Sequence, residues 1–139
     1  YCRTTIKILN NMKKAFISLL SLNAAIQGFF GVQLTFNTNA FVAKFNNVQQ
    51  LTQIEFNQSM FFGTSLLMSF VLLIYAIYLT TKESKPGIIL GIMLSLYPFA
   101  LGFFALFLIH TSDFLVFDSI RGGLAAVAGY LYLRKRNLN

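Results

Sequence analysis

Asp118 and Arg121 form the one pair of opposite charges that lies inside a long apolar stretch of this sequence. Side chains three residues apart share one face of an α-helix, so a carboxylate and a guanidinium at this spacing can pair. Arginine near the centre of a membrane helix costs about 2.5–3.5 kcal/mol on insertion scales, which makes an inward-facing arginine a functional candidate by default. The chemistry it favours is binding of a small anionic or polar ligand. The alternative is structural: Arg121 pairs with Asp118 and Gln27 and fixes the helix register.

Four further polar residues are expected at a similar depth or at the outer ends of the same helices. Asn23 and Gln27 are one helical turn apart, and Glu55 and His110 border other apolar stretches. We therefore predict an outward-facing polar pocket between the helices, with Arg121 at its floor. The candidate site residues are Arg121, Asp118, Gln27, Asn23, Glu55 and His110.

Residues that would support catalysis or metal binding are sparse. The sequence has one histidine and one cysteine, and it contains no Walker A loop and no CxxC, HExxH or GxSxG motif. His110 and Asp113 are three residues apart, but one histidine beside carboxylates at a loop is more often solvated than bound to zinc. We therefore expect no enzymatic activity, no metal and no cofactor.

The composition argues against an ordinary soluble domain. Hydrophobic residues make up 56% of the 139 residues, charged residues make up 11%, and the mean hydropathy is +0.65. A soluble domain carries about 25% charged residues, so this chain has too few to cover a surface in water. Lipid is the solvent that fits, and the length fits a single integral membrane domain over residues 1–139.

Four apolar stretches divide the sequence, and each has at least 20 residues. That length crosses about 30 Å of hydrocarbon as an α-helix, whereas membrane strands need an alternating pattern that this sequence lacks. The connections after the second and third stretches are short, which makes neighbouring helices antiparallel. We therefore predict an all-α fold, a four-transmembrane-helix antiparallel bundle, with spans at about 15–36, 60–80, 87–109 and 114–133.

The longest connection, residues 37–59, contains apolar residues at spacings of three and four. This is the pattern of one apolar helix face, so we predict a short amphipathic helix that lies flat on the outer membrane surface. The face comprises Phe41, Phe45, Val48, Leu51 and Ile54.

The basic residues predict the orientation of the chain. With both termini in the cytoplasm, Lys44 is the one lysine or arginine in the outer loops, and nine lie on the inner side. This count obeys the positive-inside rule and is typical of a bacterial inner membrane protein. Because the charges cluster at helix ends, we expect the lipid bilayer and not nucleic acid as the partner. The nine are Arg3, Lys7, Lys13, Lys14, Lys82, Lys85, Arg134, Lys135 and Arg136.

The N-terminal stretch has two interpretations. Met12 followed by two lysines and an apolar run is typical of a bacterial start, which makes residues 1–11 upstream or partial sequence. The same run followed by small residues at 23–25 also resembles a signal peptide, whose cleavage would leave three helices. We favour an uncleaved first helix, because the apolar run continues to Phe36.

Small residues form stripes on three of the four predicted helices. Such stripes let helix backbones approach closely, which is a main source of helix association in lipid. We expect them to pack within one chain, and the alternative is a face for a homo-oligomer or a partner membrane protein. The stripes comprise Ala24 and Gly28, with Gly31 beside them; Gly87, Gly91, Ser95 and Gly102; and Gly122, Ala125, Ala126 and Gly129.

The length, the longer first loop, the short basic second turn, Gly63 and Gly91 form a pattern over residues 12–136. This pattern resembles the DoxX-like small four-helix membrane proteins of bacteria. The resemblance implies the architecture and carries over no site, because Asp118 and Arg121 depart from the charged positions common in related sequences. We expect a non-enzymatic accessory or small-ligand-binding membrane module. The alternative is a small oligomeric transporter or channel for an ion or a small polar or anionic solute.

Overall fold

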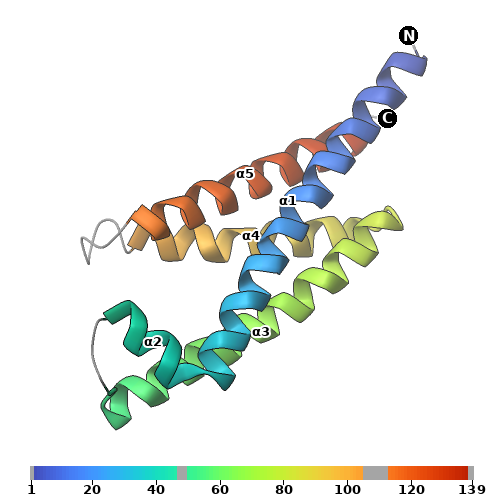
Figure 1. Ribbon diagram of the computed structural model, residues 1–139. Helices are drawn as coiled ribbons and strands as arrows, with labels where there is room; N and C mark the ends of the chain where they lie inside the picture. The colour runs from blue at the N-terminus through green and yellow to red at the C-terminus, as the bar shows by residue number, and fades with distance from the viewer. Residues whose placement is uncertain (1, 47–49, 105–112, 138–139) are drawn as a thin grey trace. The chain divides into compact units, whose positions relative to one another are not determined.

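The computed structural model describes residues 2–46, 50–104 and 113–137. These residues form five α-helices, shown in Figure 1. The prediction of an all-α fold is therefore confirmed for the described residues. The helices are α1 (Cys2–Phe36), α2 (Thr38–Asn46), α3 (Gln53–Thr81), α4 (Lys85–Phe104) and α5 (Asp113–Asn137).

The four predicted apolar stretches coincide with α1, α3, α4 and α5, although the helix ends differ. Both α1 and α3 begin earlier than the apolar stretches that they contain. Within the described residues, two helices are long and apolar enough to cross a membrane, namely Ile6–Phe36 within α1 and Gln53–Thr81, which is α3. Helix α4 holds a shorter apolar segment, Lys85–Ala100. Residues 105–109 of the third predicted span lie outside the described residues.

The first loop differs from its prediction after α2. A short helix is present there, but the predicted apolar face does not continue, because Leu51 lies outside any helix and Ile54 lies in the first turn of α3. The reason is a capping box. The Thr52 hydroxyl accepts a hydrogen bond from the Glu55 N–H group (3.3 Å), and the Glu55 carboxylate accepts one from the Thr52 N–H group (2.8 Å). The prediction of one helix face from Phe41 to Ile54 is therefore wrong.

The chain divides into two compact units, and α1 and α3 each contribute to both. The first unit comprises residues 1–23 and 73–139, which include the beginning of α1, the end of α3, and all of α4 and α5. The second unit comprises residues 24–72, which include the rest of α1, α2 and most of α3. Three of the candidate site residues with described side chains belong to the first unit and two to the second.

In the second unit, α1 and α3 pack against each other through glycines. A Cβ atom on Gly63 would lie 2.6 Å from the Cβ atom of Leu34, which is closer than real atoms approach. Gly28 faces the ring of Phe70, where a Cβ atom would lie 3.0 Å from the nearest ring carbon. Residue numbers rise along α1 as they fall along α3, so the two helices are antiparallel in this unit.

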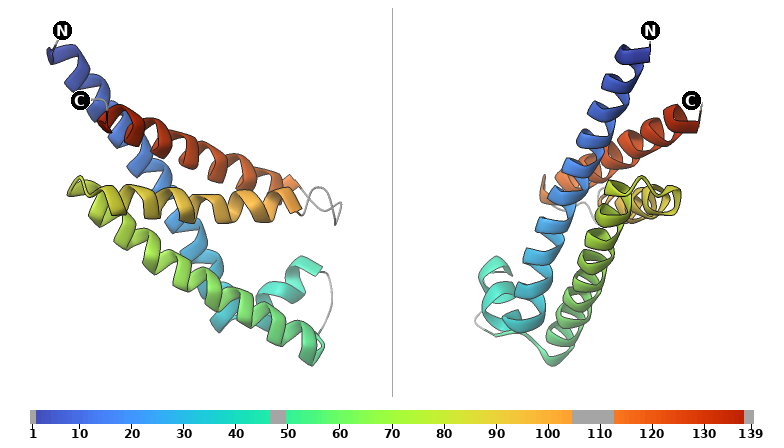
Figure 2. Two further views of the ribbon diagram at one scale, coloured as in Figure 1. Left: turned by 180° about the vertical axis from the view of Figure 1, so that it is seen from behind. Right: turned by 90° about the vertical axis from the view of Figure 1, so that its right-hand side faces the viewer.

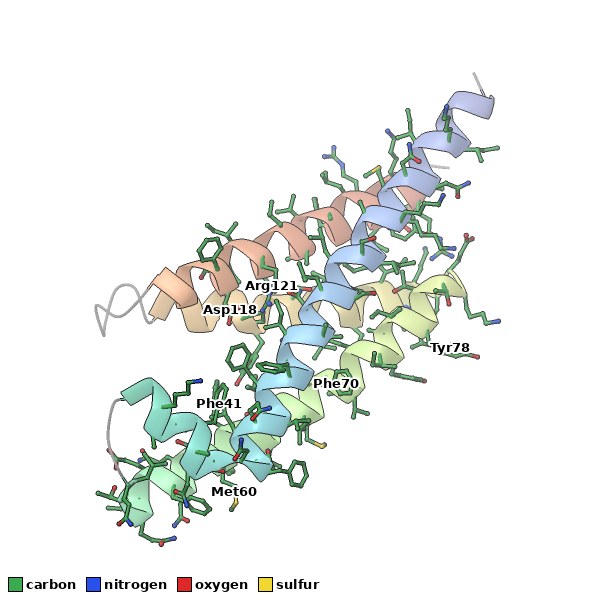
Figure 3. The ribbon with its side chains drawn as sticks, viewed as in Figure 1. Phe41, Met60, Phe70, Tyr78, Asp118 and Arg121 are labelled. Carbon is green, nitrogen blue, oxygen red and sulfur yellow. The ribbon has the colours of Figure 1, made fainter. Side chains whose placement is uncertain are left out.

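Helix α2 folds back on the end of α1. The ring of Phe41 packs edge-on against those of Phe30 and Phe29, with centroid distances of 5.8 and 6.4 Å (Figure 3). The Thr38 hydroxyl donates a hydrogen bond to the carbonyl oxygen of Leu34 at 2.6 Å. These contacts hold the first turn of α2 and the ring of Phe41 against α1.

In the first unit, α4 and α5 lie side by side (Figure 2). Gly129 of α5 meets Ile92 of α4 and Phe16 of α1, and Gly91 of α4 meets Phe16 and Leu20. Packing of the small-residue stripes within one chain is therefore confirmed at these glycines. Among the described residues, the largest fully buried side chains all belong to this unit: Tyr132, Phe16, Leu20, Leu73, Ile88, Asn23, Thr80 and Ser95.

The turn between α3 and α4 closes on Glu83, which has a left-handed φ of 59°. Its N–H group donates to the Thr80 carbonyl oxygen, and the Ser84 N–H group donates to the Leu79 carbonyl oxygen, each at 3.0 Å. These are the two hydrogen bonds of a Schellman motif. The Lys13 ammonium of α1 donates to the Glu83 carboxylate at 2.9 Å. The turn is therefore attached to α1 at one end of the first unit.

Candidate functional site

Helix α5 positions the charged pair, and its faces are reversed relative to those of a helix in a soluble protein. Its buried face carries small and polar residues, and its exposed face carries large apolar residues. As a result, Arg121 lies on the packed face of α5. The buried face comprises Ser119, Arg121, Gly122, Ala125, Ala126, Gly129 and Tyr132, and the exposed face comprises Phe117, Ile120, Leu124, Val127 and Leu131.

Arg121 and Asp118 form the ion pair that their spacing predicts. Nη2 of Arg121 lies 2.8 Å from Oδ1 of Asp118, and the two side chains are 10% and 24% exposed (Figure 3). The Nε–H group of Arg121 is buried and has no partner within the described part of the chain. The carboxylate therefore neutralises the guanidinium without satisfying all of its donors.

The backbone of α4 packs closely against α5 next to this pair. A Cβ atom on Gly122 would lie 2.6 Å from the Ser95 carbonyl oxygen and 2.7 Å from the Phe99 nitrogen. The Ser119 hydroxyl donates a hydrogen bond to the Phe99 carbonyl oxygen at 2.8 Å, which links α5 directly to α4. The Ser95 hydroxyl donates within α4 to the Gly91 carbonyl oxygen at 2.8 Å. These contacts set the register of α5 on α4, and thereby the position of Arg121.

Asn23 is another buried polar residue of the first unit that lacks a partner among the described residues, and Thr80 and Arg136 also have such atoms. It is fully buried, and neither its amide nitrogen nor its amide oxygen has a hydrogen-bond partner within the described ranges. It follows Leu20 by three residues on the face of α1 that packs against Gly91 of α4. Burying an unpaired polar group costs about 1–3 kcal/mol, so a bound ion, water or ligand is the usual explanation.

The other three candidate residues belong to the second unit or lie outside the described residues. Gln27 is buried in the second unit, and both of its amide atoms lack a partner among the described residues. Glu55 also belongs to the second unit, where it caps the start of α3 with Thr52. His110 lies outside the described residues. Of the predicted site, the structure brings Arg121 and Asp118 together, and the pocket itself stays a prediction.

Metal coordination has no basis in the described residues. No group of three histidine, cysteine, aspartate or glutamate side chains gathers there at metal-binding distance. The weak metal set considered from the sequence included His110 and Asp113, whose side chains are not among those described.

Ser119 is a site neighbour that sequence reasoning missed. Its hydroxyl reaches across to α4, although nothing in its immediate sequence requires this contact. A signal was present, because Ser119, Gly122 and Ala126 continue one stripe of small residues at spacings of three and four. Extending the stripe by one turn would have placed Ser119 at the helix contact.

Comparisons with known proteins suggest no function for this chain. No protein-family model, curated protein or solved structure matches the chain. The resemblance to DoxX-like proteins stays a prediction, carried by the loop pattern and by Gly63 and Gly91.

Proposed function

We propose that this chain is an integral membrane protein with four transmembrane helices, α1, α3, α4 and α5. The support comes from large apolar side chains that face outward on α3 and α5. Phe61, Met68 and Val71 of α3 are 79%, 64% and 61% exposed, and Phe117 and Leu124 of α5 are 71% and 56% exposed. Soluble monomers rarely expose continuous apolar patches larger than a few hundred Å², whereas lipid solvates such a surface.

The proposed orientation places both termini in the cytoplasm. The Lys13–Glu83 contact brings the first half of α1 to the α3–α4 turn, and Arg136 near the end of α5 acts electrostatically on the same carboxylate. Three basic segments of the sequence therefore gather at one end of the first unit. Basic residues concentrate on the cytoplasmic side of inner membrane proteins, which supports this end as the inner one.

The proposed activity is non-enzymatic binding of a small anionic or polar ligand by the packed face of α5. The observation that carries this proposal is the buried guanidinium of Arg121, whose Nε–H group lacks a partner although Asp118 neutralises its charge. Asn23 in the same unit adds an unpaired amide donor and acceptor. A ligand with anionic or carbonyl oxygens would satisfy such donors.

A binding module fits the first unit better than a channel does. A channel needs polar side chains on matching faces through the whole membrane thickness. Large apolar side chains instead fill much of the described core of this unit, including Phe16, Leu20, Leu73 and Ile88. The transporter or channel alternative therefore gains no support from the described packing.

Thermal unfolding of the detergent-solubilised chain tests the binding proposal. Phosphate, sulfate, acetate and chloride would be titrated against the parent, Arg121→Gln and Arg134→Gln, an exposed matched control on the same helix. A ligand at a hundredfold excess over its Kd stabilises by about 2.7 kcal/mol. We expect at least one anion to raise the melting temperature of the parent and of Arg134→Gln, but not of Arg121→Gln. Equal shifts in all three, or none in the parent, would count against the proposal.

A further inference from the structure

The guanidinium of Arg121 uses only one donor of a two-donor fork. The Nε–H group and one N–H group of Nη2 point the same way in the guanidinium plane, so together they match two oxygens of one anion. Nη2 lies 2.8 Å from Oδ1 of Asp118 (Figure 3), whereas the buried Nε–H group has no partner among the described residues. The ion pair therefore leaves a bidentate site half occupied.

Asp118 is the member of the pair that can give way to a ligand. Its side chain is 24% exposed against 10% for that of Arg121, so solutes in the surroundings reach the carboxylate first. Arg121 is held on the packed face of α5, where Gly122 meets the Ser95 carbonyl oxygen of α4. Because Asp118 precedes Arg121 by three residues on the same helix, the backbone restricts its approach. A free anion has no such restriction and can align two oxygens with the two donors.

An anion that displaces Asp118 changes the charge balance of this site. As it stands, one carboxylate neutralises one guanidinium. With a bound anion beside an ionised Asp118, the site would carry an uncompensated negative charge, which is costly away from bulk water. A proton on Asp118 removes that cost, because a neutral carboxyl group next to the pair of Arg121 and a monovalent anion leaves the site without net charge.

The described surroundings hold no other charge that could compensate. Within the described residues, Arg121 is the one group whose charge acts on the Asp118 carboxyl. The α4 residues that meet this part of α5 are Ser95, Pro98 and Phe99, and none of them ionises. Asp118 is therefore the described group that would take up the proton. The other ionisable residues with described side chains on α1, α3 and α4 of this unit are Lys7, Lys13, Lys14, Tyr75, Tyr78, Lys85 and Tyr97.

We propose that Arg121 binds a small monovalent oxoanion of the carboxylate or nitrate type together with one proton, which Asp118 takes up as the anion displaces it. Two oxygens of the anion accept hydrogen bonds from the Nε–H group and from Nη2. Because such coupling is reciprocal, acid strengthens anion binding and the anion strengthens proton binding. This inference rests on the ligand binding proposed above, and it names the class of ligand and the control of its affinity.

Isothermal titration calorimetry of the purified full chain in a non-ionic detergent tests the coupling. Nitrate and chloride would be titrated from about pH 6 to about pH 8, a range in which neither anion changes its protonation, so that any pH dependence belongs to the protein. Repeating each titration in two buffers with different enthalpies of ionisation counts the protons taken up. Asp118→Asn is compared with Glu83→Gln, a matched control that removes the carboxylate of the other ion pair of the first unit.

We expect the affinity of the parent for nitrate to rise by about tenfold for each unit by which the pH falls, with about one proton taken up per anion. Glu83→Gln should behave like the parent. In Asp118→Asn the amide is neutral at every pH, so the affinity should be independent of pH. Nitrate should bind about tenfold or more tightly than chloride, because a monatomic ion cannot accept from both donors in the same geometry.

The outcomes separate this inference from the function on which it rests. Nitrate binding that depends on Arg121 but takes up no proton, or a pH dependence that persists in Asp118→Asn, would overturn the coupling and leave the binding function standing. Equal affinities for nitrate and chloride would overturn the oxoanion class. No binding of any anion over this pH range would overturn the binding function and the inference together. If Asp118→Asn does not fold, the proton count of the parent in the two buffers decides the question.

Discussion

Gly122 of α5 lies directly against Ser95 of α4, such that a Cβ atom on Gly122 would lie 2.6 Å from the Ser95 carbonyl oxygen. A backbone atom cannot move aside as a flexible side chain can, so this contact fixes how closely the two helices approach. The adjacent Gly123 is different, because a Cβ atom there would meet the side-chain ring of Phe99 at 3.2 Å and no backbone atom.

Gly122→Ala should destabilise the chain, whereas Gly123→Ala should not. Overpacking against the α4 backbone costs about 1–3 kcal/mol, which outweighs the roughly 1 kcal/mol that alanine gains over glycine within a helix. At Gly123 the helix propensity gain remains and the Phe99 ring can shift. Thermal unfolding in detergent measures both effects. Equal stability of the two variants would contradict the close approach at Gly122.

Asp118→Asn should weaken the fold and strengthen anion binding at the same time. Removing the carboxylate leaves the guanidinium of the buried Arg121 side chain without its counter-charge, at a cost of about 1–3 kcal/mol. In the variant, a small anion no longer competes with the Asp118 carboxylate for Arg121. The anion should therefore stabilise the folded variant more than it stabilises the parent. Titrating the anion during thermal unfolding checks both parts. A smaller anion effect than in the parent would argue that Arg121 is inaccessible to ligands.

The Lys13–Glu83 pair predicts a specific loss of stability in acid. The hydrogen bond and charge of Lys13 lower the pKa of the Glu83 carboxyl below its ordinary value of 4.5. Because the folded chain then binds this proton less tightly than the unfolded chain does, the contribution is complete above about pH 5 and is lost as pH falls through the lowered pKa. The Glu83 side chain is 58% exposed, so we expect the pair to contribute only about 0.5 kcal/mol to the free energy of unfolding.

The contribution of the pair is measured by comparing the free energy of unfolding of the parent with that of Glu83→Gln from pH 7 to about pH 3. The stability difference should be largest at neutral pH and should shrink on acidification. A difference that stays constant over this range would show that the carboxylate charge contributes nothing to the turn.

Thr52→Ala should destabilise the start of α3 by about 1 kcal/mol, because it removes the side-chain oxygen that accepts from the Glu55 N–H group. Thr52→Ser keeps that oxygen and should stay close to the parent. Circular dichroism during thermal unfolding compares the three chains. If Thr52→Ser lost as much stability as Thr52→Ala, the capping hydrogen bonds would not be the cause.

Cysteine labelling tests the proposed topology. In a Cys2→Ser background, Ala40→Cys in α2 should react with a membrane-impermeant maleimide on intact cells. Lys85→Cys and Asn137→Cys should react only after permeabilisation, because the α3–α4 turn and the C-terminus are expected in the cytoplasm. All three residues are exposed, so burial does not limit the reaction. Labelling of Ala40→Cys and Lys85→Cys from the same side would contradict the proposed arrangement.

The sequence was most informative about which stretches are helical, and least informative about where helices begin. Apolar runs of about 20 residues located α1, α3, α4 and α5, because hydropathy reports the part of a helix that is rich in apolar residues. It does not report the polar turns that extend a helix. The start of α3 at Gln53 instead depends on the pair Thr52 and Glu55, a pattern that is legible in the sequence as Thr-x-x-Glu.

The part of the candidate site that lies on a single helix could be predicted from the sequence. The spacing of Asp118 and Arg121 predicts their ion pair, because both side chains come from α5. The bond from Ser119 to Phe99 was not predictable from spacing, because it depends on the register between two helices. That register is set by the contact at Gly122, and a one-dimensional pattern does not specify it.

The reversed faces of α5 also have a consequence for how the sequence can vary. At the exposed positions, such as Leu124 and Val127, almost any apolar residue of similar length would serve. At Gly122 and Gly129, even one added methyl group meets a neighbouring helix. Mutational tolerance along α5 should therefore rise and fall with the helical period. Most of the information that specifies this part of the fold then resides in its smallest residues.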